Sequence, residues 1–144
     1  MDKEKFEDKQ SNSKLLLRKI AFKLPALIIV ITLWILSSQS TLPQLKGILG
    51  FDKLQHLTAY AALAFSLGFW FFPHRCQPWR VFLIPALIAS CYGAIDEFHQ
   101  YFVPGRACDV WDWIADTLGA VLGAGAFVLI SSFFARERQA KDGI

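Results

Sequence analysis

The sequence predicts an all-α, polytopic membrane protein, a bundle of four transmembrane helices with both termini in the cytoplasm. The 144 residues are 54% hydrophobic. Charged residues crowd the two ends and a few short breaks, and long apolar runs lie between them, which is typical of polytopic membrane proteins. The length suits one domain. We expect a polar, basic tail over residues 1–19, a membrane domain over 20–134 and a polar tail over 135–144.

The first span is expected from Ile20 to Leu36, where the apolar stretch LPALIIVITLWIL is densest. A helix needs about 20 residues to cross the apolar core of a bilayer. Lys23 can lengthen the run because its charge can reach the interface, and Pro25 lies near the start, where proline costs little. A long charged leader precedes this run and no A-x-A-like site follows it, so we expect a retained anchor and not a cleaved signal peptide.

The second span is expected from Phe51 to Phe72, after a connection that proline and glycine interrupt. It begins with polar residues and then becomes apolar. Asp52, His56 and Tyr60 are spaced i, i+4 and i+8, so they share one face of the helix. The aromatic run FWFF at 69–72 is typical of an interfacial belt.

The third span is expected from Val81 to Phe102 and the fourth from Val110 to Phe134, with a proline-glycine break between them at 103–106. The apolar part of the third span ends at Ile95, and two carboxylates follow at once. Five residues are spaced to lie along one face of the fourth span: Asp109, Asp112, Asp116, Gly119 and Gly123. The two glycines let a neighbouring helix approach closely.

The distribution of lysine and arginine predicts the orientation. Four spans put both termini on one side, and twelve of the fifteen basic residues lie on that side or in the short turn that shares it. The positive-inside rule therefore places both termini in the cytoplasm. The polar ends of the second, third and fourth spans then meet at the outer face. The candidate ligand-binding residues there are Asp52, Lys53, His56, Tyr60, Asp96, Glu97, Gln100, Arg106, Asp109, Asp112 and Asp116.

Some of these residues also have ordinary structural roles. Asp109 is a candidate N-cap of the fourth span, and Asp112 in its first turn can complement the helix dipole. Asp116 lies two turns in, where neither role applies. His99 is one step off the Asp96–Gln100 face, so we expect it toward lipid headgroups or water. Two tryptophans, Trp111 and Trp113, are expected as outer interfacial anchors.

Three interpretations of the cluster remain open. It can be a closed network of salt bridges that fixes helix packing. It can bind an anionic headgroup, with Arg106 as a bidentate clamp and Lys53 as a second cation. It can also be a hydrolytic site in which His56 or Glu97 is the general base and aspartates hold a hard divalent cation.

Several classes of site lack their motifs. No HExxH or similar zinc spacing occurs, and the three cysteines, Cys76, Cys91 and Cys108, have no metal spacing. We therefore assign no metal and no cofactor. No G-x-S-x-G elbow, P-loop or G-x-G-x-x-G is present, and no basic face suggests a nucleic-acid partner.

Three blocks in order resemble one known family, the VanZ-like membrane proteins. They are Asp52-Lys53-x-x-His56-x-x-x-Tyr60, Asp96-Glu97-x-x-Gln100-x-x-x-Pro104-x-Arg106, and Asp112 with Gly119 and Gly123. One departure is Asp116, where many members carry Asn. The resemblance implies a small, multi-pass protein of the bacterial inner membrane. The family is named for an accessory factor in glycopeptide (teicoplanin) resistance, so a link to resistance is one expectation, although most members occur without such a resistance cluster.

The leading hypothesis is an outward-facing polar pocket that binds an anionic component of the cell envelope, with a lipid-linked or cell-wall precursor as the candidate class. One alternative is a lipid-phosphate hydrolase that uses His56 and Glu97. Another is a structural membrane subunit. Membrane lipids are the expected surroundings, and the sequence leaves open both catalysis and the oligomeric state.

Overall fold

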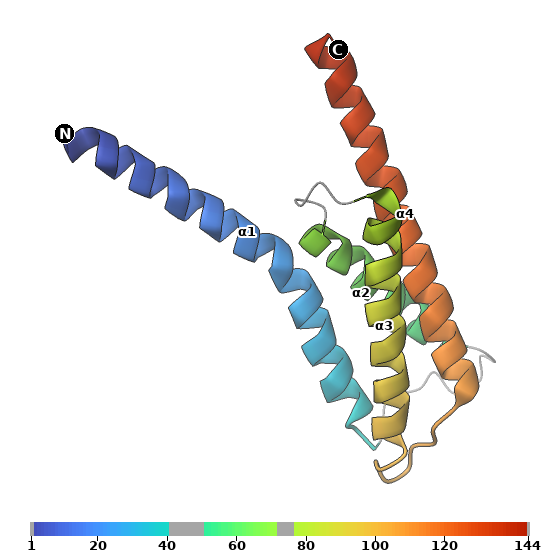
Figure 1. Ribbon diagram of the computed structural model, residues 1–144. Coiled ribbons are helices and arrows are strands. Elements are labelled where there is room, and N and C mark those ends of the chain that lie inside the picture. The colour runs from blue at the N-terminus through green and yellow to red at the C-terminus, as the bar shows by residue number, and fades with distance from the viewer. Residues whose placement is uncertain (1, 41–50, 72–76, 144) are drawn as a thin grey trace.

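The computed structural model describes residues 2–40, 51–71 and 77–143, and the regular secondary structure in these ranges is helical. The four helices are α1 (Asp2–Ser37), α2 (Phe51–Phe71), α3 (Pro78–Gln100) and α4 (Val110–Asp142). Figure 1 shows α3 and α4 running side by side, with α2 crossing between α4 and the lower half of α1. The prediction of an all-α fold is confirmed.

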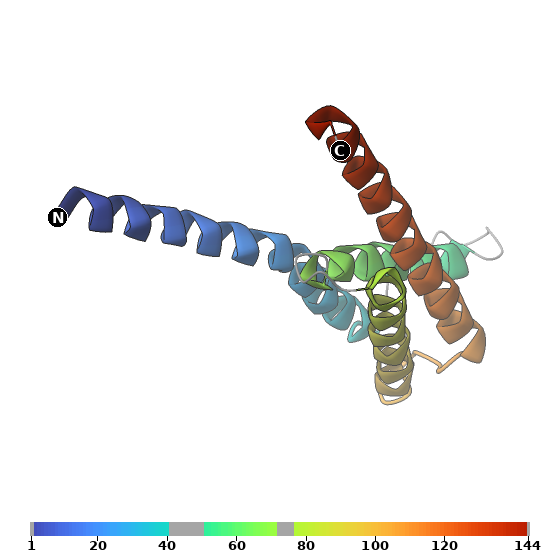
Figure 2. The same ribbon diagram turned by 45° about the horizontal axis from the view of Figure 1, so that its top comes forward.

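Helix α1 is longer than the predicted first span, because it begins at Asp2 and continues through Pro25. Residues 2–19 contain no proline or glycine and are rich in lysine and leucine, which favour helix. The expected polar tail is thus helical. α1 bends part-way along (Figure 1), and its N-terminal half points away from the bundle in both ribbon views (Figure 2). A proline inside a helix removes one hydrogen bond and kinks the axis.

The core lies where α2 packs on α4, the most extensive helix pair. A Cβ atom at Gly119 would overlap the backbone of Leu57, and one at Gly123 would overlap the backbone of Ala61. The absence of side chains therefore allows the two backbones to touch, as predicted for small residues. The neighbouring core is built mainly from alanines, including Ala64, Ala89, Ala120 and Ala124, and it contains larger side chains such as Tyr60 and Leu63.

Polar contacts hold α3 between α1 and α4. The hydroxyl groups of Ser90 and Thr117 lie 2.8 Å apart, and the indole of Trp113 donates to the carbonyl of Ser90 at 3.1 Å. On the other side, the hydroxyl of Tyr92 donates to the carbonyl of Val30 at 3.0 Å. Buried hydroxyl and indole groups need such partners, so these bonds fix how α3 is rotated and which residues it turns toward α2.

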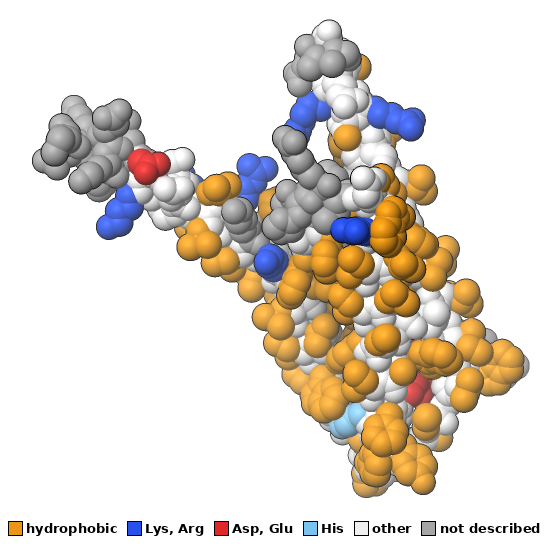
Figure 3. Space-filling model, viewed as in Figure 1, with side chains coloured by type: hydrophobic (Ala, Val, Ile, Leu, Met, Phe, Trp, Pro, Cys, Tyr) orange, Lys and Arg blue, Asp and Glu red, His pale blue; other side chains and the backbone are white. Residues whose placement is uncertain are grey.

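Three helices in the described ranges are long and apolar enough to cross a membrane: residues Asp8–Ser37, Pro78–Gln100 and Val110–Lys141. Their outward faces expose large apolar side chains such as Ile28, Phe98 and Leu129. Figure 3 shows hydrophobic side chains covering most of the visible bundle. Exposed apolar surface of this extent is unfavourable in water and suits a lipid environment, so these are the features of a membrane protein.

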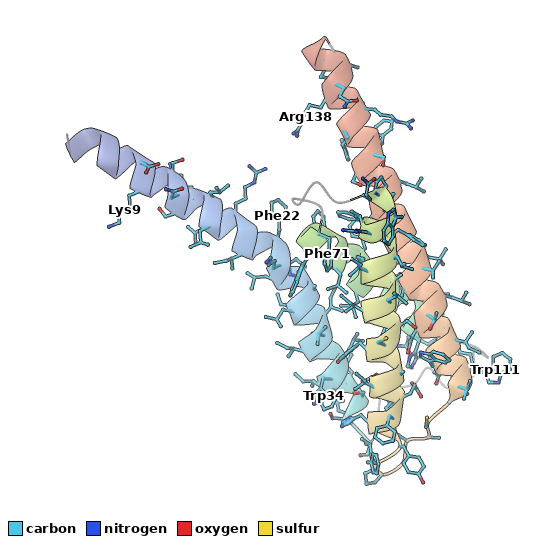
Figure 4. All side chains as sticks on the ribbon, viewed as in Figure 1. Lys9, Phe22, Trp34, Phe71, Trp111 and Arg138 are labelled. Carbon is cyan, nitrogen blue, oxygen red and sulfur yellow. The ribbon has the colours of Figure 1, made fainter. Side chains whose placement is uncertain are left out.

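The two ends of the bundle differ in composition. On the face drawn in Figure 3, basic side chains gather toward the end that carries both termini. Figure 4 places Lys9 and Arg138 toward that end, and Trp34 and Trp111 at the opposite one. The side chain of Trp111 is exposed, as expected for an interfacial anchor.

Candidate functional site

The candidate site is a cavity of about 310 Å³ at the end of the bundle opposite the termini. There the C-terminal ends of α1 and α3 meet the N-terminal ends of α2 and α4, together with the connection that precedes α4. The lining residues are Leu33, Leu36, Ser37, Asp52, Gln55, His56, Ala59, Tyr60, Asp96, Gln100, Gly105, Arg106, Ala107, Asp109 and Asp112. The three blocks of the sequence therefore meet at one place.

Lys53 lies at the centre of a network of carboxylates. Its Nζ atom is 2.7 Å from Asp112 Oδ1, 3.1 Å from Asp109 Oδ2 and 3.5 Å from Asp52 Oδ2. These contacts join the first turn of α2 to the start of α4. The charge of Lys53 is thus already shared among three acids of the protein itself, and its expected role as a second cation for a ligand stays a prediction.

Asp109 has the predicted capping role. Its side chain accepts a hydrogen bond from the backbone N–H of Trp111 at 2.9 Å, which satisfies one unpaired donor at the start of α4. That bond, together with the Lys53 ammonium, lowers the pKa of the Asp109 carboxyl below its ordinary value. The backbone N–H of Asp109 in turn donates to Glu97 Oε2 at 2.9 Å. Glu97 is thus held against the connection between α3 and α4.

His56 contacts a buried carboxylate, Asp116, within the site. His56 Nδ1 lies 2.9 Å from Asp116 Oδ1, and His56 Nε2 lies 4.0 Å from Asp112 Oδ2. Asp116 is fully buried. It has room because residue 93 is glycine: a Cβ atom there would lie 2.8 Å from Asp116 Oδ2. Neither capping nor the helix dipole accounts for a carboxylate at this depth.

Three buried polar atoms near His56 have no hydrogen-bond partner among the described residues. They are Asp116 Oδ2, Asp96 Oδ1 and the hydroxyl oxygen of Tyr60. The other oxygen of Asp96 accepts from Gln100 Nε2 at 3.2 Å. Buried polar atoms are almost always paired with protein, water or ions, and Asp96 and Tyr60 line a cavity with room for such an occupant.

Arg106 differs from Lys53 because no carboxylate in the described ranges lies within ion-pair distance of it. It lines the cavity, and its buried Nε atom has no partner among those residues. Its backbone N–H donates to the carbonyl of Val103 at 3.1 Å, which helps to fix the tight break before α4. The positive φ of 83° at Gly105 also requires a residue without a side chain.

The site as a whole is acidic. Its carboxylates are Asp52, Asp96, Glu97, Asp109, Asp112 and Asp116, and the permanent cations among the described site residues are Lys53 and Arg106. Asp116 is fully buried and its ion pair is with His56, not with a permanent cation. Carboxylates in such surplus repel one another unless protons or bound cations offset their charge.

The contribution of α1 was not predicted. Leu33, Leu36 and Ser37 form one wall of the cavity, and Trp34 stacks on His99 with ring centroids 4.1 Å apart. His99 therefore contacts α1, whereas the sequence suggested lipid headgroups or water. The only sequence signal for this contribution was that Trp34 and Ser37 end an apolar run at the same membrane level as the polar cluster. Cys91 and Cys108 are free and exposed, while Cys76 lies outside the described residues.

Comparison with known proteins gave one result. A family model described as VanZ/LLP1 matches residues 2–131. This range includes every candidate site residue and the parts of all four helices that surround the cavity. No curated protein and no solved structure matched the chain.

Proposed function

Because the chain belongs to the VanZ/LLP1 family, we propose that it is a multi-pass protein of the bacterial inner membrane that binds an anionic headgroup of the cell envelope through Arg106. The candidate ligands are lipid-linked or cell-wall precursors, which carry phosphate groups at the membrane surface. The cavity, its position at one end of the bundle and a guanidinium without a carboxylate partner among the described residues support this proposal.

The proposal includes four crossings of the membrane. α2 is not among the three helices apolar enough along their length to cross a membrane, because its first turns carry polar residues. It nevertheless has 21 residues, about 30 Å of helix. Its start is tied through Lys53 to the beginning of α4. Near its end, Trp70 donates to the carbonyl of Lys23 at 3.3 Å, and the Lys23 ammonium lies over the same indole. α2 thus extends from the cavity end to the basic end of the bundle.

Four crossings place both termini on the same side as the basic residues. The positive-inside rule then assigns that side to the cytoplasm. Trp34 and Trp111, at the other end (Figure 4), fit an outer interface. In this orientation the cavity opens toward the outer leaflet, where precursors of the cell envelope are used.

The binding proposal rests on the guanidinium of Arg106. A guanidinium presents a planar fork of donors that matches two oxygens of a phosphate or carboxylate. Lys53 is occupied by three carboxylates, so Arg106 is the available permanent cation of the described lining. A cavity of about 310 Å³ is at the small end of ligand sites. It suits a headgroup, with the lipid chain outside.

The test compares purified parent protein with Arg106→Ala and Arg106→Lys in nanodiscs. A panel of anionic lipids, including a polyprenyl diphosphate, is presented to each and binding is measured by native mass spectrometry. We expect Arg106→Ala to lose tenfold or more of the affinity for phosphate-bearing lipids, since a charge-assisted bond contributes about 1.5–3 kcal/mol. Arg106→Lys should keep part of this affinity. Arg138→Ala, far from the cavity, is the matched control, and equal binding by Arg106→Ala and the control would overturn the proposal.

A lipid-phosphate hydrolase is the second candidate, and one observation favours it. His56, Glu97 and Asp116 offer ligand or base atoms that all lie within 4.8 Å of one another. A histidine and a carboxylate at this range can activate a water molecule. The hydrolase predicts phosphate release from lipid diphosphates that Glu97→Gln removes. Purified parent protein without turnover, with and without added divalent cations, would exclude this candidate and leave the binding proposal standing.

A further inference from the structure

Three side chains that are far apart in the sequence converge beside the cavity. His56 comes from α2, Glu97 from α3 and Asp116 from α4, and one ligand atom of each lies within 4.8 Å of the other two. His56 is half-buried, and the two carboxylates are buried. Each element supplies one donor, so the arrangement depends on the packing of three helices and has no local sequence motif.

Convergence of acidic groups is not enough to indicate a ligand, but the same place contains unpartnered buried atoms. Asp116 is fully buried and its Oδ2 atom has no partner among the described residues. Asp96, 3% exposed, and Tyr60, fully buried, each line the cavity with an oxygen in the same state. Buried carboxylate oxygens need a partner, which can be a proton, an ordered water or a cation.

The charge of the surroundings selects a cation. Lys53 is engaged by Asp52, Asp109 and Asp112. Among the described residues, Asp116 then has only His56 as an ion-pair partner, and Glu97 has none. A divalent ion beside them would offset the negative charge that two buried carboxylates carry.

We propose that His56, Glu97 and Asp116 form a binding site for one divalent transition-metal ion, such as Zn²⁺ or Mn²⁺. One imidazole nitrogen with two carboxylates suits these ions better than Mg²⁺ or Ca²⁺, which prefer oxygen ligands throughout. In a tetrahedral site, metal–ligand bonds of about 2.0–2.2 Å put the ligand atoms about 3.3–3.6 Å apart. The three ligand atoms lie within 4.8 Å of one another, so metal binding requires the side chains to move inward by about 1 Å.

The proposal also gives a role to the other polar atoms of the site. Three protein ligands leave positions on the ion for water or for a bound group, as in sites of the catalytic type. The hydroxyl of Tyr60 and the free oxygen of Asp96 are the groups available to hydrogen-bond such a water. The metal site rests on its own geometry and does not depend on the headgroup that Arg106 binds.

The experiment measures metal directly. Full-length protein with a histidine-free tag is purified in detergent, stripped with EDTA, dialysed against Zn²⁺ or Mn²⁺, and analysed by inductively coupled plasma mass spectrometry. We expect about one ion per chain and a rise in melting temperature that grows with ion concentration, because the ion binds the folded state. Glu97→Gln and Asp116→Asn should each weaken binding tenfold or more. Glu137→Gln, on the exposed end of α4, is the matched control.

A spectroscopic measurement on the parent protein covers the case in which a variant fails to fold. Electron spin echo measurements on the Mn²⁺-loaded protein should show coupling to one imidazole nitrogen. His56→Gln should remove that coupling and His99→Gln should not. No retained metal, no nitrogen coupling, or equal metal content in the parent and all three ligand variants would overturn the site. None of these results would bear on lipid binding by Arg106.

Discussion

Lys53 Nζ of α2 and Asp112 Oδ1 of α4 lie 2.7 Å apart, the shortest of three ion pairs that this lysine makes. The pair connects the two helices at the point where both begin. It also orients the first turn of α2, so that His56, one turn further on, faces Asp116. The lysine of the site therefore positions the two helices, and the proposed ligand contact falls to Arg106.

Removal of this ion pair should lower stability. Lys53 is 39% exposed and Asp112 is 15% exposed, so solvent screens part of the attraction. We expect Lys53→Met to cost about 1 kcal/mol, partly because three carboxylates then repel one another. A double-mutant cycle with Asp112→Asn, measured by thermal unfolding in detergent, should give a coupling energy of about 0.5–1 kcal/mol. Additive effects of the two substitutions would show that the pair does not couple the helices.

The backbone contact between α2 and α4 gives a prediction with an internal control. A Cβ atom at Gly119 would overlap the carbonyl of Leu57, whereas one at Gly125 would lie 3.8 Å from the Phe82 ring, an ordinary contact. Gly119→Ala should therefore cost about 1–3 kcal/mol. Gly125→Ala should be neutral or raise stability by up to about 1 kcal/mol, since alanine favours helix. Unfolding in detergent measures both, and equal effects would contradict the close packing.

Much of the fold was predictable because its boundaries are local. Phe51 begins α2 as predicted, Val110 begins α4, and proline and glycine mark the breaks between the helices. Residues 2–19 were harder to assign. Their charged composition favours helix, but they lack the pattern of apolar residues that usually indicates a helix. The close approach at Gly119 was also predictable from the spacing of small residues.

The partners within the site were less predictable. Spacing placed Asp52, His56 and Tyr60 on one face, and all three line the cavity. Which acid each cation meets depends on how the helices rotate about their axes. That rotation follows from contacts such as Ser90 with Thr117, which no local pattern specifies. The sequence suggested Arg106 as a clamp and Lys53 as a second cation. In the structure Lys53 is paired with three carboxylates, whereas Arg106 has no carboxylate within ion-pair distance among the described residues.

The N-cap of α4 should make stability depend on pH in the acid range. The pKa of Asp109 is lowered in the folded state by the Trp111 N–H and by Lys53. Its charge therefore stabilises the fold above the ordinary aspartate pKa of about 4, and this contribution is lost as the pH falls through the lower, folded-state value.

Asp109→Asn keeps a capping oxygen but removes the charge. The difference in melting temperature between parent and Asp109→Asn should be present at pH 7 and should disappear as the pH falls below 4. A difference that does not change with pH would assign the whole effect to geometry.

The proposed orientation can be tested with a thiol that the chain already has. Cys108 is free and exposed in the connection before α4, at the end of the bundle opposite the termini. In a Cys76→Ser, Cys91→Ser background it is the remaining cysteine. A membrane-impermeant maleimide should label it in intact spheroplasts, because the connection lies on the outer side.

The matched control adds Cys108→Ser and Gln139→Cys, an exposed site near the C-terminus, which should react only after the membrane is opened. Labelling of both sites without permeabilisation would mean that α4 does not cross the membrane. The reverse pattern would place the cavity in the cytoplasm, where the ligand would have to be a precursor that has not yet been exported.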